Sequence, residues 1–228
     1  MLNLTKFDAD GFAITQPILT PNDTTRLISL IEQHTIPNNK RGGIRDIMHR
    51  VPELIQVSNH PAVRSIVESI LDSTAFIVRS TLFDKTDNAN WKVPWHQDVT
   101  IAVSKRVELE GYGPWSNKES ITHVQPPTEV LNRMVTVRVH LDPCPASNGA
   151  LRVMPGTHKL GRINQNDAPQ YVSAGNDVCC EVAAGAALVM RPLILHASSP
   201  SAIPTHRRVL HFDFATGDLP AGLEWRMR

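Results

Sequence analysis

Short apolar runs separated by turn residues fill the chain from residue 75 onward, and this pattern constrains the fold more than any other feature. The 17 prolines and 12 glycines of the chain interrupt apolar sequence at many places, as is typical of β-rich folds. The runs are rich in residues that favour strands. They cover residues 75–83, 134–142, 150–154, 178–182, 186–190, 193–197 and 207–214.

Two amphipathic helices are predicted ahead of these runs. Residues 23–34 follow the capping side chains of Asn22 and Asp23 and carry apolar residues at helical spacing. Residues 61–73 begin with Pro61, which is tolerated in the first turn of a helix. Short strands after two leading helices predict a mainly β fold, a sandwich or barrel with flanking helices on one side.

Three polar segments are predicted to be loops: residues 36–50, 104–132 and 157–176. The second is long for a compact domain, so we expect it to act as a lid. The first carries four basic side chains, Arg41, Arg45, His49 and Arg50. Charged side chains in a loop are usually solvated; the alternative is that they line the mouth of a site for an anionic substrate.

Length and charge exclude several classes of protein. A chain of 228 residues predicts a single domain over residues 1–228. The net charge of +1 gives no support for a nucleic-acid or membrane-surface partner. We expect no membrane span and no secretory signal, because no apolar run approaches the length of about 20 residues that a span needs.

The cysteines also bear on the environment of the protein. Cys144, Cys179 and Cys180 are odd in number and lack paired C-x-x-C spacing. Such a set forms neither a disulfide framework nor a typical zinc site. The sequence therefore predicts a reducing, cytoplasmic location.

His96 and Asp98 lie two residues apart at the end of the segment 91–98. On a strand, both side chains leave the same face, because strand side chains alternate. An imidazole and a carboxylate supply two of the three ligands of a 2-His-1-carboxylate site for non-haem Fe(II). One such triplet is weak support, because it arises often by chance and also fits a half-buried strand with hydrogen-bonded polar residues.

The chain contains two further triplets of this kind, His140-x-Asp142 and His211-x-Asp213. Asp142 precedes a proline-rich turn and is typical of a turn residue. The triplet at His211 lies in the last predicted strand. Only the pair His96 and Asp98 stands beside the long polar segment 104–132, so it is the best candidate for a metal site.

The third ligand must come from a distant part of the chain. His196 follows the apolar run 193–195 and precedes a polar segment, which makes it the best candidate. The alternative, a core histidine with a backbone partner, is equally compatible with the sequence.

Four motifs follow one another in the chain, and together they resemble the phytanoyl-CoA dioxygenase family. They are His96-Gln97-Asp98, residues 148–158 (NGALRVMPGTH), residues 192–200 (PLILHASSP) and residues 207–215 (RRVLHFDFA). The resemblance extends from about Asp10 to about Thr216. It implies a double-stranded β-helix core of the jelly-roll, cupin-like type over about residues 75–216, preceded by a helical part over about residues 20–73.

The resemblance also implies roles for individual residues. His96, Asp98 and His196 match the iron ligands of the family. Arg207 matches the arginine that binds the distal carboxylate of 2-oxoglutarate, which suits a guanidinium because its planar fork bonds a carboxylate in two places. Ser198 matches a hydroxyl that helps to hold the same carboxylate.

The same family resemblance bears on four other residues. Gln97 and Arg138 match positions that face the cosubstrate or the substrate. Arg208 is a rival of Arg207, but it lies on the opposite face of the strand, so only one of the two can point inward. His158 is interpreted as structural.

The activity implied is that of a dioxygenase that uses Fe(II), 2-oxoglutarate and O2. Such an enzyme oxidises an unactivated C–H bond of a small-molecule metabolite, most simply by hydroxylation, and releases succinate and CO2. Related halogenases replace the carboxylate ligand with a small residue, so Asp98 favours an oxygenase. Two alternatives stay open: a cupin-like metal-dependent isomerase or epimerase, which does not need Arg207, and a non-catalytic binding module of the same fold.

The substrate is not identified by the sequence. Several basic side chains are candidates to pair with an anionic group: Arg41, Arg45, Arg79, Lys85 and Arg138. Trp91 and Trp95 are predicted to pack in the core, where aromatic side chains are common. The oligomeric state is left open.

Overall fold

The computed structural model describes residues 2–34, 43–173, 175–202 and 206–228. Its α-helices are α1 (Leu4–Asp10), α2 (Pro21–His34), α3 (Ile47–Arg50), α4 (Ile55–Ser58), α5 (Pro61–Ile70), α6 (Thr128–Asn132) and α7 (Ala168–Val172). Short 3-10 helices cover Pro52–Leu54, Ala146–Asn148 and Thr157–Leu160. None of the helices in the described part of the chain has the length and apolar character that a membrane crossing requires.

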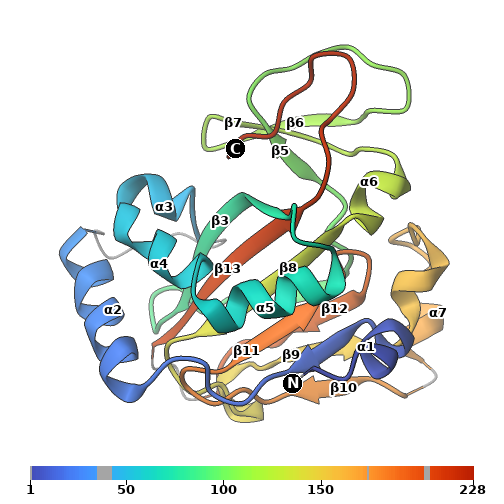
Figure 1. Cartoon of the computed structure of the whole chain (residues 1–228). Coiled ribbons are helices and arrows are strands. Elements are labelled where there is room, and N and C mark those ends of the chain that lie inside the picture. The colour runs from blue at the N-terminus through green and yellow to red at the C-terminus, as the bar shows by residue number, and fades with distance from the viewer. Residues whose placement is uncertain (1, 35–42, 174, 203–205) are drawn as a thin grey trace.

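The strands form three antiparallel sheets (Figure 1). Their bounds are β1 (Phe12–Ile14), β2 (Ile44–Arg45), β3 (Phe76–Lys85), β4 (Val93–His96), β5 (Ile101–Val103), β6 (Trp115–Lys118), β7 (Ile121–Val124), β8 (Met134–His140), β9 (Leu151–Met154), β10 (Val178–Cys180), β11 (Ala187–Met190), β12 (Leu195–Ser198) and β13 (Arg207–Ala215). The largest sheet has the order β1-β11-β8-β13-β3-β2, and the second has the order β10-β9-β12-β4. This mainly β architecture with flanking helices confirms the predicted fold class.

The sequence of β8 shows how the largest sheet separates its two faces. Val135, Val137 and Val139 are fully buried in the core that also contains apolar residues of α2 and α5. Thr136 and Arg138 lie between them and therefore point to the opposite face, because strand side chains alternate. One face of the sheet is thus apolar and covered by helices, while the other is free to carry polar groups.

The long strand β13 repeats this division. Leu210, Phe212 and Phe214 join the apolar core under the helices, and Figure 1 shows α5 lying across this face of the sheet. Arg207 and His211 belong to the alternate set and line a cavity on the other face. Burial of the apolar set stabilises the sheet, since each large side chain contributes about 1.5–3 kcal/mol.

The second sheet, β10-β9-β12-β4, covers the polar face of the largest sheet. Leu151 and Val153 of β9 pack with Leu188 and Met190 of β11 in a core between the two sheets. This apolar packing fills one end of the space between the sheets. The other end opens into the cavity.

The segment 104–132 differs from its prediction as a loop. It contains β6, β7 and α6. Strand β6 pairs with β7, and β7 pairs with β5, which makes the third sheet at the top of Figure 1. The hairpin turn uses Glu119 and Ser120, both with positive φ (53° and 64°). Such turns usually contain Gly or Asn, so the sequence carried no ordinary signal for this hairpin.

Four other predictions of secondary structure were wrong or incomplete. The sequence of residues 7–19 predicts a turn followed by a short strand; the strand is present as β1, but α1 takes the place of the turn. The helix from Pro61 ends at Ile70 instead of residue 73. The predicted loop 36–50 contains β2 and α3 in its described part. The predicted loop 157–176 contains a 3-10 helix and α7.

Candidate active site

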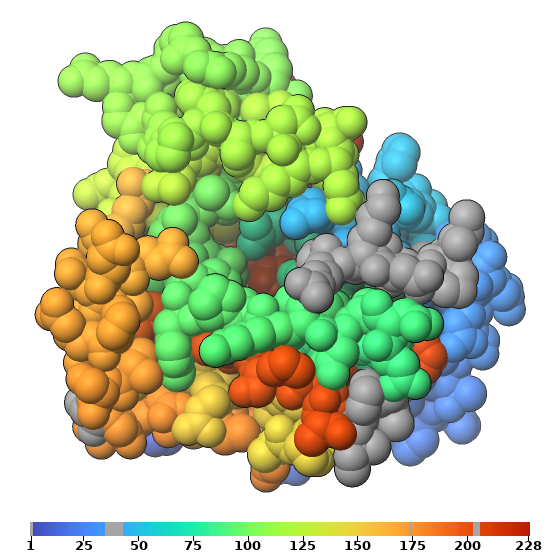
Figure 2. Space-filling view, turned by 180° about the vertical axis from the view of Figure 1, so that it is seen from behind, coloured from blue at the N-terminus to red at the C-terminus, as the bar shows by residue number. Residues whose placement is uncertain are grey.

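A cavity of about 250 Å³ opens between the two larger sheets and the third sheet. Figure 2 shows the hollow from outside, below the segment that forms the third sheet. It is lined by side chains from β2, β3, β4, β6, β7, β8, β9, β12 and β13. Elements that are far apart in the sequence therefore meet here.

His96 and His196 face each other across neighbouring strands. His196 on β12 pairs in register with His96 on β4, and the centroids of their rings are 4.2 Å apart. The Nδ1–H of His96 donates to the carbonyl of Pro94 (2.8 Å), and that of His196 donates to the carbonyl of Ile194 (2.9 Å). Because a carbonyl only accepts, each ring keeps the Nε2 lone pair free for a metal ion.

Asp98 completes this group from a position just beyond β4. The strand ends at His96, so the prediction that both residues lie on one strand was wrong. The backbone N–H of Asp98 instead donates to the carbonyl of Pro192 (2.9 Å), which holds the residue beside β12. Its Oδ2 lies 3.9 Å from Nε2 of His196. The possible ligand atoms of the three residues all lie within 4.8 Å of one another.

The protonation states at this group suit a metal ion. Burial and the neighbouring His96 lower the pKa of His196 to about 3, so its imidazole is neutral at ordinary pH. Burial opposes ionisation of Asp98, but His196 and Arg79 outweigh it and hold the pKa of this carboxyl below its ordinary value. Neutral imidazoles and an ionised carboxylate are the forms that bind a metal ion.

One end of the cavity, which we call the carboxylate end, consists of Arg207, Ser198 and Lys85. Arg207 Nη1 lies 3.4 Å from the hydroxyl of Ser198 and also donates to the carbonyl of Gly149. Lys85 Nζ donates to the same hydroxyl (2.8 Å) and to the carbonyl of Ser199 (2.5 Å). Arg207 and Lys85 are opposite each other on β13 and β3, so two cationic groups meet one hydroxyl.

The charges of the carboxylate end are buried, and no ion-pair partner for them lies among the described residues. Lys85 is 0% exposed and Arg207 is 4% exposed. Burial and the charge of Arg207 lower the pKa of Lys85 to about 7. Among the described residues, no atom accepts from the buried Nε of Arg207. A bound anion would satisfy this donor and offset both charges.

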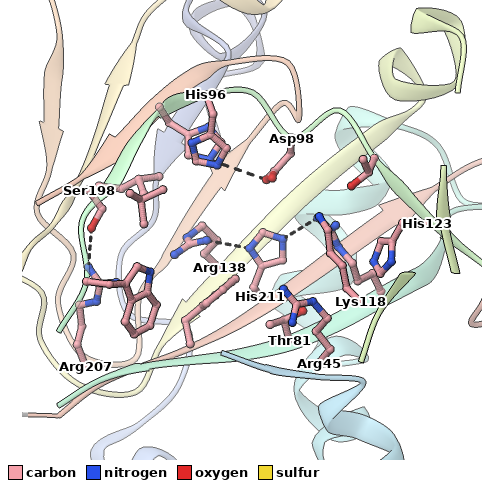
Figure 3. Close-up of a pocket in the computed structure, with 17 residues that line it drawn as sticks. Arg45, Thr81, His96, Asp98, Lys118, His123, Arg138, Ser198, Arg207 and His211 are labelled. Carbon is pink, nitrogen blue, oxygen red and sulfur yellow. Dashed lines mark hydrogen bonds and ion pairs between the residues drawn. The ribbon is translucent and has the colours of Figure 1, made fainter. Parts of the chain in front are cut away.

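A buried polar chain forms the floor of the cavity (Figure 3). Arg138 Nη1 donates to Nδ1 of His211 (2.8 Å), whose Nε2–H donates to Asp213 Oδ1 (3.0 Å). The hydroxyl of Thr136 donates to the same oxygen (2.6 Å), and Asp213 also forms an ion pair with Arg79. The third His-x-Asp triplet of the sequence is therefore part of this chain.

The other end of the cavity, which we call the outer end, consists of Arg45, Lys118 and His123. They come from β2, β6 and β7. Figure 3 places them on the far side of Arg138 and His211 from Arg207 and Ser198. Lys118 and His123 were missed in the sequence, because they lie in the segment predicted as a loop.

Several predicted site residues lie elsewhere than expected. Gln97 is turned away from the cavity: its amide donates to the carbonyls of Gly161 and Leu193 and accepts from the N–H of Ile163. Its predicted contact with the cosubstrate is not supported, because these hydrogen bonds hold the side chain away from the cavity. Arg138 does line the cavity, and its buried Nε has no partner among the described residues.

Among the other predicted residues, some lie where the sequence placed them and others do not. Arg208 points to the helices, where it pairs with Asp142 (3.1 Å) and with Glu32 of α2 (2.6 Å). Trp91 lines the cavity, so its prediction as a core residue was wrong, whereas Trp95 packs against the core as expected. Arg41 lies outside the described residues.

Two of the basic residues proposed for an anionic substrate have other neighbours. Lys85 belongs to the carboxylate end, beside Ser198. Arg79 lines the cavity but is paired with Asp213. Among those predicted basic residues that the structure describes, only Arg45 lies at the outer end.

Solved structures of similar fold share most of this architecture. EvdO2 from Micromonospora carbonacea var. aurantiaca, solved with 2-oxoglutarate, is 20% identical with a TM-score of 0.67, over 93% of this chain and 89% of that chain. HygX from Streptomyces hygroscopicus, solved with iron bound, is 14% identical with a TM-score of 0.67, over 93% and 85%. SnoN, a non-heme alpha ketoglutarate dependent epimerase from nogalamycin biosynthesis, is 13% identical with a TM-score of 0.70, over 94% and 82%.

At these identities the likeness concerns the fold, and it confirms the predicted jelly-roll, cupin-like core. No curated protein matches the chain. The family model described as phytanoyl-CoA dioxygenase (PhyH), however, matches residues 7–209. This match covers most of the 228 residues. The chain therefore belongs to the phytanoyl-CoA dioxygenase family.

Proposed function

We propose that this chain is a dioxygenase that binds Fe(II) through His96, Asp98 and His196 and uses 2-oxoglutarate and O2. The family to which it belongs uses this metal ion and these cosubstrates. One observation carries the proposal: three ligand atoms of the 2-His-1-carboxylate type lie within 4.8 Å of one another, in the same cavity as Arg207 and Ser198.

The three side chains fit Fe(II) in both number and form. Two imidazoles, each with its Nε2 directed away from a backbone carbonyl, and one carboxylate make up the set that holds non-haem Fe(II) on one face. The backbone carbonyls of Pro94 and Ile194 fix the orientation of the two rings. Such outer contacts select the tautomer and raise the basicity of a histidine ligand.

The carboxylate end fits the distal carboxylate of 2-oxoglutarate. Arg207 and Ser198 would hold it, as the resemblance implies, and the position of Lys85 supplies a further cation that the sequence did not assign to this role. The unpartnered Nε of Arg138 would face the cosubstrate from the floor of the cavity. When bound, iron, 2-oxoglutarate and O2 supply the oxidising chemistry and yield succinate and CO2.

The protein itself supplies binding, orientation and exclusion of water from the reacting atoms. His196 is 3% exposed and Asp98 lies within the same enclosed space. A small-molecule substrate placed beside the metal ion would then be oxidised at an unactivated C–H bond. Hydroxylation is the outcome we propose, because Asp98 keeps the carboxylate ligand that related halogenases lack.

Two other functions remain as alternatives. A metal-dependent isomerase or epimerase that does not use 2-oxoglutarate has no need for the buried pair Arg207 and Lys85. SnoN shows that a protein of this fold can be a 2-oxoglutarate-dependent epimerase, so an oxidative epimerisation is compatible with the same site. A non-catalytic binding module would hold iron and 2-oxoglutarate without consuming them.

We further propose that residues 1–228 act as one catalytic domain in a reducing, cytoplasmic compartment. Free cysteine thiols support this proposal: Cys144, Cys179 and Cys180 are all unpaired, and Cys144 and Cys180 are buried. An oxidising compartment would favour cysteines arranged in disulfides.

Anaerobic addition of Fe(II) and 2-oxoglutarate, followed by visible absorption, tests the proposed function. A weak charge-transfer band near ~500 nm is expected for a 2-oxo acid chelated at this type of iron centre. The band should disappear in His96→Ala and weaken in Arg207→Ala, while Arg208→Ala, on the opposite face of the same strand, should retain it. Iron binding without any band would favour the isomerase, whereas a band without consumption of 2-oxoglutarate in air would favour the binding module.

A further inference from the structure

The outer end of the cavity has no role in the chemistry proposed above. Arg45, Lys118 and His123 line the same cavity as His96 and Asp98. In Figure 3 they lie beyond Asp98, on the side away from Arg207. A second basic site therefore stands where a substrate would approach the metal ligands while 2-oxoglutarate fills the carboxylate end.

The positive charge at the outer end is only partly balanced. Arg45 pairs with Glu119 (2.9 Å), whose side chain is 41% exposed, and an exposed pair of this kind contributes little. Arg79, the next cation inward, is already paired with Asp213. Within the described part of the chain Lys118 has no ion-pair partner, and residues 1, 35–42, 174 and 203–205 contain no Asp or Glu that could serve as one.

Neighbouring cations act on Lys118. Partial burial, followed by the charges of Arg45 and Arg79, lowers the pKa of its ammonium group, while the charge of Asp98 opposes this shift. The three cations therefore repel one another in the absence of a ligand. An anion bound between Arg45 and Lys118 would remove this repulsion and form charge-assisted hydrogen bonds.

His123 offers a different function in the same place. Its Nδ1–H donates to the carbonyl of Ile121 (2.9 Å), which leaves Nε2 as an acceptor. Burial is the main cause that lowers the pKa of His123 to about 4, and the charges of Arg79, Lys118 and Arg45 lower it further. The ring is therefore neutral at ordinary pH and accepts a hydrogen bond instead of carrying charge.

We propose that the substrate carries an anionic group, a carboxylate or a phosphate, that binds between Arg45 and Lys118, and a hydroxyl that donates to Nε2 of His123. These two contacts place a C–H bond of the substrate beside the metal ligands His96 and Asp98. This inference rests on the proposed function, because it assigns the substrate class of the same site. A neutral or cationic substrate would leave the repulsion between Arg45 and Lys118 in place.

Anion binding to the full chain tests the first contact. The protein is loaded anaerobically with Fe(II) and saturating 2-oxoglutarate, so that the carboxylate end is filled, and is titrated with inorganic phosphate and with butyrate in a calorimeter at low salt. At least one of these anions should bind the wild type. Arg45→Gln and Lys118→Gln should each weaken that binding by about tenfold, as expected for loss of one charge-assisted hydrogen bond.

Two further variants make this test specific. Lys105→Gln removes an exposed lysine of the same polar segment that does not line the cavity, and it should leave binding unchanged. Glu119→Gln removes the carboxylate that competes for Arg45, so it should strengthen binding by about threefold. A variant that merely disturbed the hairpin would weaken binding, so the direction of the Glu119→Gln effect separates the two explanations.

The contact with His123 is tested by 3-hydroxybutyrate, which adds one hydroxyl to butyrate. The wild type should bind 3-hydroxybutyrate more tightly than butyrate by about fivefold, since a neutral hydrogen bond contributes about 1 kcal/mol. His123→Phe should abolish this preference, and His123→Gln, which keeps an acceptor, should restore part of it. Equal binding of the two acids by the wild type would overturn this part of the proposal.

The absorption band and the anion titrations distinguish failure of the anionic-substrate proposal from failure of the dioxygenase proposal. If the band near ~500 nm forms but neither anion binds the wild type more tightly than Lys118→Gln, the substrate class proposed here is wrong. If the anions bind as described but the band does not form, the outer end is an anion site and the dioxygenase proposal is wrong.

Discussion

The two basic ends of the cavity are built in different ways. The carboxylate end is buried and lies on the long strands β3 and β13, where Lys85 and Arg207 bond to backbone carbonyls. The outer end lies on the two-residue strand β2 and on the β6–β7 hairpin, and Arg45 there is only half-buried. The carboxylate end thus rests on long paired strands, as suits the proposed cosubstrate site, whereas the proposed substrate site rests on short peripheral elements, which vary more readily among proteins.

The proposed metal ligands lie between the two ends, so their loss should have the largest effect. His196→Ala removes one of the three proposed ligands at a buried position. We expect Fe(II) affinity to fall more than about a hundredfold, because loss of an outer hydrogen-bond partner alone reduces metal affinity by about 10–100-fold. Anaerobic metal titration measures the change, and oxidation of 2-oxoglutarate should be lost with it.

Anion binding at the outer end provides the matched measurement for His196→Ala. In the described part of the chain, neither Arg45 nor Lys118 forms a hydrogen bond or ion pair with His96, Asp98 or His196, so the anion that binds the wild type should still bind this variant at low salt. Loss of anion binding together with Fe(II) binding would show that the outer end and the metal ligands depend on one common structure.

The polar chain between the two ends should have the largest effect on stability. Asp213→Asn leaves Arg79, which is 18% exposed, without its ion-pair partner. Breaking a buried pair from one side costs about 3–5 kcal/mol, so urea unfolding should show a loss of that order. Asp177→Asn, which breaks the more exposed pair with Arg152, is the control and should cost less than about 1 kcal/mol.

Arg207 and Arg208 provide a matched pair that isolates the carboxylate end. Arg207→Ala should raise the KM for 2-oxoglutarate by about 30-fold or more, because truncating one partner of a buried charged contact costs about 2–5 kcal/mol. Arg208→Ala removes an ion pair with α2 and should lower stability while leaving that KM nearly unchanged. An equal rise in KM for both variants would contradict the assignment.

The smallest effect expected concerns a proton on Lys85. Its pKa of about 7 means that Lys85 is mostly neutral at pH 8. A carboxylate bound beside it raises that pKa, so binding of 2-oxoglutarate at pH 8 should take up a fraction of a proton, and affinity should fall as the pH rises above about 7. Arg138, with a pKa of about 10, keeps its charge in this range.

Calorimetry in two buffers of different protonation enthalpy measures this uptake on the iron-loaded protein. Lys85→Met, which keeps the length of the buried side chain, should abolish it. The outer end offers the contrast: phosphate binding should not depend on Lys85. Proton uptake of the same size in Lys85→Met would place the titrating group elsewhere.

The division of faces was the part of the fold that could be predicted from the chain alone. The alternation of Val135, Val137 and Val139 with Thr136 and Arg138 requires one apolar and one polar face of a strand. The same period of two allows only one of Arg207 and Arg208 to point inward, and the family resemblance selects Arg207. The set His96, Asp98 and His196 was predicted from the order of its motifs, and the structure brings these residues together.

Other features depended on contacts that no local pattern records. The hairpin turn at Glu119 and Ser120 lacks the usual Gly or Asn, so β6 and β7 could not be anticipated. The position of Asp98 beyond its strand is held by a hydrogen bond to Pro192, about a hundred residues away in the chain. Gln97 is turned outward because its amide bonds to loops after β9 and before β12.

The sequence by itself determined which residues could bind a metal ion and which face of each strand is polar, because side-chain chemistry and strand periodicity are local properties. Only the tertiary structure decided that Lys85 joins Arg207 at one end of the cavity, and that Arg45, Lys118 and His123 form the other. These groups come from strands that are paired or packed across long sequence separations. Their proximity is therefore a consequence of how the sheets assemble, and no short stretch of the chain encodes it.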